Sequence, residues 1–405
     1  MSDLLGFISI GLVSLLTLIV ALRFSSIFDI LLIALFLRVL LIIAGHYFIV
    51  LPDSTSDATG FEAEAWVMAQ EGFFHVMSRF TGPDPVFITW LIAIPYSLFG
   101  QSIMLAQSIS LLFGIGSVFL GWKVAKKVWN DRIAKKVACT IAIFPSLVLY
   151  SSLVLREAYI VFFLLLALYG VVTWVKTKNY SSIVLSMTGF IGATFFHGAM
   201  MLGGLVFLTI VGTTHLIKLF ESLKNYRVGV KSLIISLIFV TLLGLYLSNK
   251  IRVSYLGNFA STTSLDNIER KTKGATRGTA SWPEWTKVNS PVEMIYKLPI
   301  RAIYLIFAPF PWDVSELRHY IGIADAFLYI YLSFLIFCNI KTIWRDPTLR
   351  IFLLILLVYI LVFGVGVGNF GTGIRHRAKF VVIFILLAAP LLKSFTYKKQ
   401  SKLKY

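Results

Sequence analysis

The chain has 405 residues, of which 58% are hydrophobic and only 14% are charged, and its net charge is +18. Apolar runs long enough to cross about 30 Å of hydrocarbon recur along it, which excludes a soluble fold and predicts a polytopic helical membrane protein. The basic residues are scattered between these runs rather than gathered on one polar face, which argues against nucleic acid as a partner.

Eleven apolar runs are long enough to be full spans, and we expect one all-α transmembrane domain over residues 1–405. The expected spans are 4–22, 28–50, 103–122, 137–155, 158–175, 181–196, 198–216, 232–248, 319–340, 351–367 and 380–395. Two shorter apolar runs, 86–98 and 298–310, contain or adjoin proline. They are too short to cross at 1.5 Å rise per residue, so we expect re-entrant or interfacial segments.

Basic residues between the spans determine the expected orientation. The linker "KVAKKVWNDRIAKK" is the most basic of the short ones, and the positive-inside tendency places it in the cytoplasm. Counting spans from it places three segments on the outer face, namely 51–102, 249–297 and 368–379. We therefore expect a protein of the bacterial inner (cytoplasmic) membrane whose functional face is the outer, periplasmic one.

The first outer segment is acidic and contains "LPDSTSDATGFEAEAWVMAQEG". Asp57 directly precedes apolar residues at helical spacing, including Phe61 and Ala65, which predicts an amphipathic helix at the membrane surface. Asp57 then has two interpretations. It caps that helix, or it acts as a general base that takes the proton from an acceptor hydroxyl.

The sequence after this acid continues with a surface helix, then "P…W L…A…Y…L F G", and then a long span that ends in basic residues. This arrangement resembles the GT-C glycosyltransferases, which include the protein mannosyltransferase and aminoarabinose transferase relatives. "FPSLVLYSSLVLREAYIVFFLLLALYG" resembles the helix pair that follows in that superfamily, so the resemblance covers roughly residues 50–180.

The resemblance implies an enzyme that takes a sugar from a polyprenyl phosphate or diphosphate and passes it to an acceptor on the outer face. The acid of the family's first loop maps best to Asp57. The sequence departs from members that carry paired acids, because Ala58 follows Asp57. Asp53, Glu62 and Glu64 therefore remain alternatives for the base.

Several charged residues lie at span ends or inside spans. Arg156 and Glu157 are adjacent at an outer hinge, where they form a capping ion pair or hold and orient a phosphate. His197 lies at another outer hinge, either as a structural group or as a substrate contact. Arg38 lies midway along a span, where an arginine needs a partner or a wet cavity. We expect a structural role for Arg38, with Asp325 as a candidate partner and substrate binding as the alternative.

Two later outer segments are basic. The region 249–301 carries nine cations, including Arg301, against four acids, which indicates an anion ligand if the topology holds. "GNFGTGIRHRAKF" carries Arg375, His376, Arg377 and Lys379 after three glycines. The glycines allow close backbone approach, and the two arginines can grip phosphate oxygens in pairs. We interpret this segment as a phosphate clamp, with a lipid-headgroup anchor as the alternative. In many GT-C relatives a basic element opens a late span in a similar position.

The leading hypothesis is a glycosyltransferase that moves a sugar or oligosaccharide from a polyprenyl (undecaprenyl) phosphate or diphosphate donor to a lipid-linked glycan acceptor. It would act in the assembly of O-antigen, capsule or lipopolysaccharide, with a chain-length regulator as a candidate partner. An O-antigen (Wzy-type) repeat-unit polymerase is a close variant. A flippase of a lipid-linked glycan is the non-enzyme alternative. No cofactor is expected: the sequence shows no cluster of metal ligands, although a divalent metal is compatible with this chemistry.

Overall fold

The computed structural model describes residues 2–84, 86–224, 230–248, 250, 281–288, 290–313 and 317–392. Within these ranges the chain is helical and contains no β-strand, only an isolated bridge between Ser281 and Asn369. The expected basic outer segment 249–297 falls largely outside the described residues. The all-α class predicted from the sequence is confirmed.

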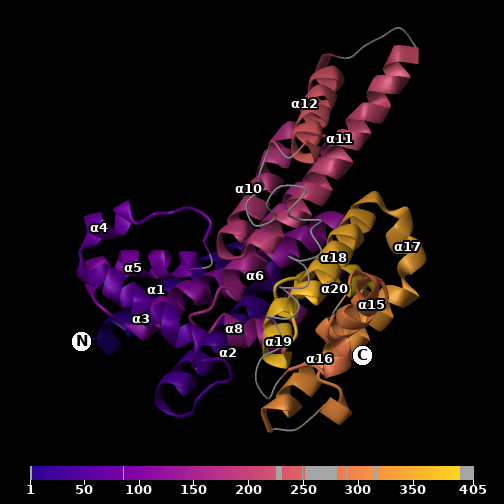
Figure 1. Cartoon of the computed structure of the whole chain (residues 1–405). Helices are drawn as coiled ribbons and strands as arrows, with labels where there is room; N and C mark the ends of the chain where they lie inside the picture. The colour runs from indigo at the N-terminus through magenta and orange to yellow at the C-terminus, as the bar shows by residue number, and fades with distance from the viewer. Residues whose placement is uncertain are drawn as a thin grey trace, which may run out of the picture.

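The described helices follow one another in chain order (Figure 1). They are α1 (Ser2–Arg23), α2 (Phe28–Tyr47), α3 (Asp57–Gln70), α4 (Phe73–Ser78), α5 (Phe87–Phe99), α6 (Ile103–Val128), α7 (Asp131–Ile143), α8 (Pro145–Tyr150), α9 (Glu157–Thr177), α10 (Tyr180–Phe196), α11 (Met201–Lys224), α12 (Val230–Leu247), α15 (Pro291–Phe307), α16 (Leu317–Cys338), α17 (Ile340–Arg345), α18 (Pro347–Gly366), α19 (Phe370–Ala378) and α20 (Val381–Ala388). Helices α11 and α12 project from the other helices as an extended pair (Figure 1).

In the described part of the chain, six helical segments are long and apolar enough to cross a membrane: Ser2–Arg23, Ser25–Tyr47, Ile103–Val128, Glu157–Thr177, Gly198–Lys224 and Pro347–Gly366. Five shorter apolar helices accompany them, among them α5, α10 and the segment Val381–Leu391. These lengths are those of a helical membrane protein. The two short apolar runs of the sequence also become helical: the first is α5, which contains Pro95, and the second lies largely within α15, which contains Pro299.

Two expectations about helix boundaries were wrong. The expected span 137–155 is not one helix, because α7 ends at Ile143 and α8 begins at Pro145. Proline has no backbone N–H to continue a helix and holds the preceding residue, Phe144, in an extended conformation. The segment 368–379 is not an open loop but contains helix α19, whose N-cap Asn369 accepts hydrogen bonds from the backbone N–H groups of Gly371 and Thr372.

Helix α20 is the most enclosed element of the described core, since all eight of its residues are buried. A helix that is apolar on every side suits such a central position, and α20 packs against α16, α18, α7 and α6. Helices α9 and α10 approach closely. A Cβ atom on Gly170 would lie 2.5 Å from the backbone nitrogen of Ser186, so small residues are required there.

Three arginines are buried in this framework and bind backbone carbonyl groups. Arg38 donates hydrogen bonds to Ser151 Oγ and to the carbonyl groups of Ala34 and Ala142. Arg301 donates to the carbonyl groups of Thr286, Gly364, Val365 and Val367.

Arg377 pairs with Asp325, the residue that the sequence offered as a candidate partner of Arg38. Its Nε and Nη2 lie 3.0 and 2.8 Å from Asp325 Oδ2, and it also donates to the carbonyl groups of Ile306, Ala308 and Gly322. The guanidinium therefore ties together α15, α16 and α19.

Candidate functional site

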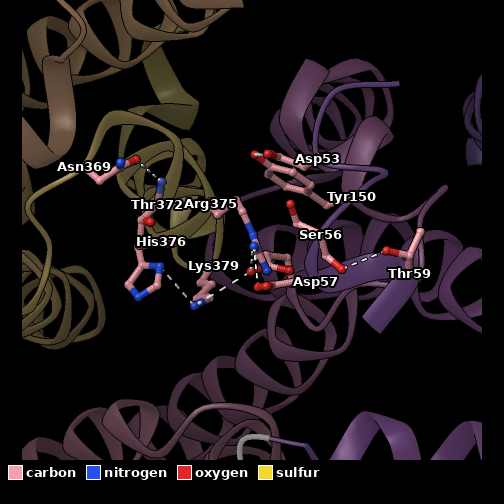
Figure 2. A network of polar contacts seen from close by, with 11 residues as sticks. Asp53, Ser56, Asp57, Thr59, Tyr150, Asn369, Thr372, Arg375, His376 and Lys379 are labelled. Carbon is pink, nitrogen blue, oxygen red and sulfur yellow. Dashed lines mark hydrogen bonds and ion pairs between the residues drawn. The ribbon is translucent and has the colours of Figure 1, made fainter. Parts of the chain in front are cut away.

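Charged residues from helices that are distant in sequence meet at helix ends. Asp57 is the first residue of α3, Glu157 is the first residue of α9, and Arg375 projects from α19. Arg375 Nη1 lies 2.7 Å from Asp57 Oδ2, and Arg375 Nε lies 3.5 Å from Glu157 Oε1. Figure 2 shows Arg375 reaching from α19 toward Asp57. The structure thus brings the acidic segment around Asp57 into contact with the basic segment around Arg375. Both segments were expected on the same face of the membrane.

Helical periodicity explains which residues of "RHRAK" reach this site. Residues at i and i+4 share one face of a helix, whereas two residues at i and i+2 point about 200° apart. Arg375 and Lys379 therefore lie on the face toward Glu157, and Arg377 points away from them to Asp325. Of the two arginines interpreted as a phosphate clamp, only Arg375 therefore faces the first acidic segment, and Arg377 is bound to the framework.

Lys379 and two histidines form the inner part of the site. Lys379 Nζ lies 3.8 Å from Glu157 Oε1 and 3.4 Å from His376 Nδ1. The rings of His376 and His197 are 5.2 Å apart and nearly perpendicular. Lys379 is fully buried, and Glu157 is 1% exposed, so this part of the site is enclosed by protein.

Burial and neighbouring charges shift the proton affinities of these groups. Burial lowers the pKa of Lys379 to about 7, although Glu157 opposes the shift. Burial also lowers the pKa values of His376 and His197 well below the usual value, and the positive charge of Lys379 adds to both shifts. Both imidazoles are therefore neutral at physiological pH and serve as hydrogen-bonding groups.

The pKa of Arg375 shifts in the opposite direction. Burial alone would lower its pKa, but the carboxylates of Glu157 and Asp57 outweigh that effect and raise the pKa above its ordinary value. Its guanidinium is therefore a permanent positive charge. Both Glu157 oxygens and Arg375 Nε are buried and make no hydrogen bond to a described residue. The 3.5 Å contact between them is an ion pair without hydrogen-bond geometry.

The loop before α3 carries a second carboxylate, that of Asp53. Tyr150, at the end of α8, donates a hydrogen bond of 3.0 Å to Asp53 Oδ2 (Figure 2). Asp53 and Ser56 have left-handed φ values of 61° and 60°, a conformation that costs L-residues energy. The strained backbone lies directly before Asp57, in the segment that presents this carboxylate to Arg375.

Arg156 is the N-cap residue of α9, beside Glu157, and its guanidinium lies over the ring of Phe61 at 5.2 Å. Because Arg156 directly precedes Glu157 and its guanidinium lies over a residue of α3, it stands at the same site. The start of α9 adds a helix N-terminus, where the dipole favours negative charge.

Other expected site residues lie elsewhere. Glu62 accepts hydrogen bonds from Tyr96 and Gln101 and so holds α3 against α5. Arg38, Arg301 and Arg377 have exposed fractions of at most 1%, and their hydrogen bonds go to the protein framework. The structure does not bring these four residues to the Asp57–Arg375 site.

The residue that sequence reasoning missed is Tyr150. It lies within an apolar run, "FPSLVLYSSLVL", and nothing in that run distinguishes its hydroxyl from those of other buried tyrosines. Tyr150 and Asp53 are also 97 residues apart in the sequence, so no local sequence pattern links them.

Among the described residues there is no group of three or more His, Cys, Asp or Glu residues placed to hold a metal ion. Comparisons with protein-family models, with curated proteins and with solved structures found no match to this chain.

Proposed function

We propose that this chain is a membrane glycosyltransferase that moves a sugar or oligosaccharide from a polyprenyl phosphate or diphosphate to a lipid-linked glycan acceptor. The observation that carries the proposal is the meeting of Asp57 with Arg375, which are 318 residues apart in the sequence. A half-exposed carboxylate thereby lies beside fixed cations, and these are the two groups that glycosyl transfer from a phosphate donor requires.

In the proposed reaction, Asp57 takes the proton of the acceptor hydroxyl. The acceptor oxygen forms a bond to the anomeric carbon as the bond from that carbon to the phosphate oxygen breaks. The bonding electron pair leaves with the phosphate oxygen, so the products are the glycosylated acceptor and polyprenyl phosphate (or diphosphate). A single displacement of this kind inverts the anomeric configuration.

Arg375, Arg156 and Lys379 are assigned to the leaving phosphate. Negative charge grows on that group as the bond breaks, and cations fixed beforehand stabilise it without reorganising. Lys379 is held by Glu157, and Glu157 also faces Arg375, so we assign this buried carboxylate to positioning the two cations rather than to proton transfer.

His376 and His197 line the inner side of the site as neutral hydrogen-bonding groups. With arginines and a lysine supplying positive charge, this chemistry has no strict need for a metal. We place the reaction at the outer face of a bacterial inner membrane, because the short basic linkers occupy the other side in the expected topology. The role in O-antigen, capsule or lipopolysaccharide assembly is proposed from the GT-C resemblance together with the size of the chain, its single large outer segment and its outer arginines.

The proposal is tested with purified protein in lipid nanodiscs, supplied with a panel of undecaprenyl phosphate-linked hexoses and lipid-linked glycan acceptors. Wild-type protein is expected to release undecaprenyl phosphate and extend the glycan. Asp57→Ala is expected to abolish both products, and Asp131→Asn, at an exposed ion pair on another part of the chain, should retain them. In a parallel assay with the protein in lipid vesicles, movement of intact lipid-linked sugar from one leaflet of the membrane to the other, without bond cleavage, would instead establish a flippase.

A further inference from the structure

The ion pair between Asp57 and Arg375 occupies both groups that the proposed reaction needs. Asp57 Oδ2 is 2.7 Å from Arg375 Nη1, so the carboxylate already accepts a hydrogen bond from a guanidinium and is less basic toward an acceptor hydroxyl. The charge of Arg375 is in turn partly neutralised before a phosphate arrives. The general base and a phosphate-binding cation therefore satisfy each other.

The two partners differ in how firmly they are held. The Arg375 side chain is 16% exposed and is backed by Glu157, whose side chain is 2% exposed. The Asp57 side chain is 48% exposed and follows a loop with left-handed backbone at Asp53 and Ser56. If the pair separates, Asp57 is the partner that moves, because strain in its loop favours rearrangement and Arg375 keeps a buried counter-charge.

A phosphate is better suited to Arg375 than Asp57 is. In the present contact Nη1 donates to a single oxygen of Asp57, while the buried Nε faces Glu157. A phosphate offers several oxygens and can engage two guanidinium N–H groups together, whereas the carboxylate here uses one oxygen. A phosphate at Arg375 would also carry its charge toward Lys379, which shares the Glu157 carboxylate with Arg375.

We propose that the Asp57–Arg375 pair is a latch that the phosphate of the donor opens, so that donor binding frees the base and precedes activation of the acceptor. The identity of the donor in this proposal rests on the function proposed above. The latch makes the reaction ordered: an acceptor that arrives first meets a carboxylate still bound to Arg375 (Figure 2).

The latch is tested by a distance measurement that does not depend on turnover. Spin labels are attached to cysteines introduced at Val67 on α3 and Thr372 on α19, both exposed, after the native Cys139 and Cys338 are replaced by serine. Electron–electron resonance distances are recorded in nanodiscs without ligand, with undecaprenyl phosphate, and with undecaprenol, which has the same tail without the phosphate.

Undecaprenyl phosphate is expected to lengthen the distance between α3 and α19, and undecaprenol to leave it unchanged. Asp57→Asn is expected to give the longer distance without ligand. It is also expected to bind undecaprenyl phosphate about fivefold more tightly, since the competing carboxylate of a partly exposed pair is lost. Glu71→Gln removes a carboxylate from the end of the same helix, where it pairs with His75 and not with the latch, so it should change neither quantity.

The outcomes separate the latch from the function. Binding of radiolabelled undecaprenyl phosphate with no change in distance, and with unchanged affinity in Asp57→Asn, would overturn the latch while leaving the phosphate site in place. No binding of undecaprenyl phosphate by wild-type protein would overturn the donor site of the proposed function itself, and the latch with it.

Discussion

The buried pair of Arg377 and Asp325 allows the sharpest prediction about stability. The substitution Asp325→Asn keeps the size and shape of the side chain but removes its negative charge. Arg377 is fully buried and the Asp325 side chain is 6% exposed, so water cannot replace the lost partner. The variant would leave a guanidinium charge inside the protein without its counter-ion.

Removing one partner of a buried ion pair typically costs about 3–5 kcal/mol. Arg377 keeps its hydrogen bonds to the carbonyl groups of Ile306, Ala308 and Gly322, which places the expected loss near the lower end, about 3 kcal/mol. The matched control is Asp131→Asn. Asp131 pairs with Lys126 and Lys135 at 3.2 and 3.3 Å, but these side chains are exposed, so the expected loss is under about 1 kcal/mol.

The assay is reversible unfolding in mixed micelles of mild detergent and SDS, which gives the free energy of unfolding for each variant. The double variant Arg377→Met/Asp325→Leu should lose less unfolding free energy than the single variants Arg377→Met and Asp325→Leu lose in sum, because it leaves neither charge buried without its partner. An Asp325→Asn loss no larger than that of Asp131→Asn would refute the assignment of Arg377 to the framework.

Three further predictions concern the site. Arg375→Lys keeps a positive charge but loses the planar pair of donors, so we expect turnover of a polyprenyl phosphate-linked sugar to fall about tenfold or more, and unchanged turnover would argue against a phosphate contact. Burial lowers the pKa of Lys379 to about 7, so the side chain is protonated below that pH and neutral above it, and turnover that depends on phosphate binding should decline as pH rises through 7. Lys379→Arg should remove this decline. The same pH profile in wild-type protein and in Lys379→Arg would contradict the assignment of Lys379 to the phosphate. A cysteine at Thr372 should react with a membrane-impermeant reagent in intact cells, and protection would contradict the outer placement of α19.

Composition and hydropathy were sufficient to predict an all-α membrane protein, because repeated apolar runs of about 20 residues are typical of membrane-spanning helices. Counting spans also predicted that Arg375 and the first acidic segment share one face of the membrane, and the contact between them came from helix packing. The break near Phe144 was visible in principle, since Pro145 marks it, but the surrounding apolar run masked the boundary. Helix α19 was missed because three glycines within "GNFGTG" weaken any helical pattern at its start.

The different roles of Arg375 and Arg377 were not predictable from their sequence neighbourhood. Both lie in one basic cluster, and only the helical conformation separates their directions. The partner of Arg377, Asp325, is 52 residues away on α16, and its choice depends on how α15, α16 and α19 pack. Tertiary packing of this kind decides which cations become framework and which remain at a site.

The central claim is that the protein cleaves the bond between a sugar and a polyprenyl phosphate. Mass spectrometry of the polyprenyl lipids in proteoliposomes, loaded with undecaprenyl phosphate-linked sugar and a glycan acceptor, tests it most directly. The account predicts that wild-type protein converts the donor to undecaprenyl phosphate in equal molar amount to the glycosylated product, and that Asp57→Ala leaves the donor intact. Donor that stays intact with wild-type protein across the full donor and acceptor panel, or equal conversion by Asp57→Ala, would contradict it.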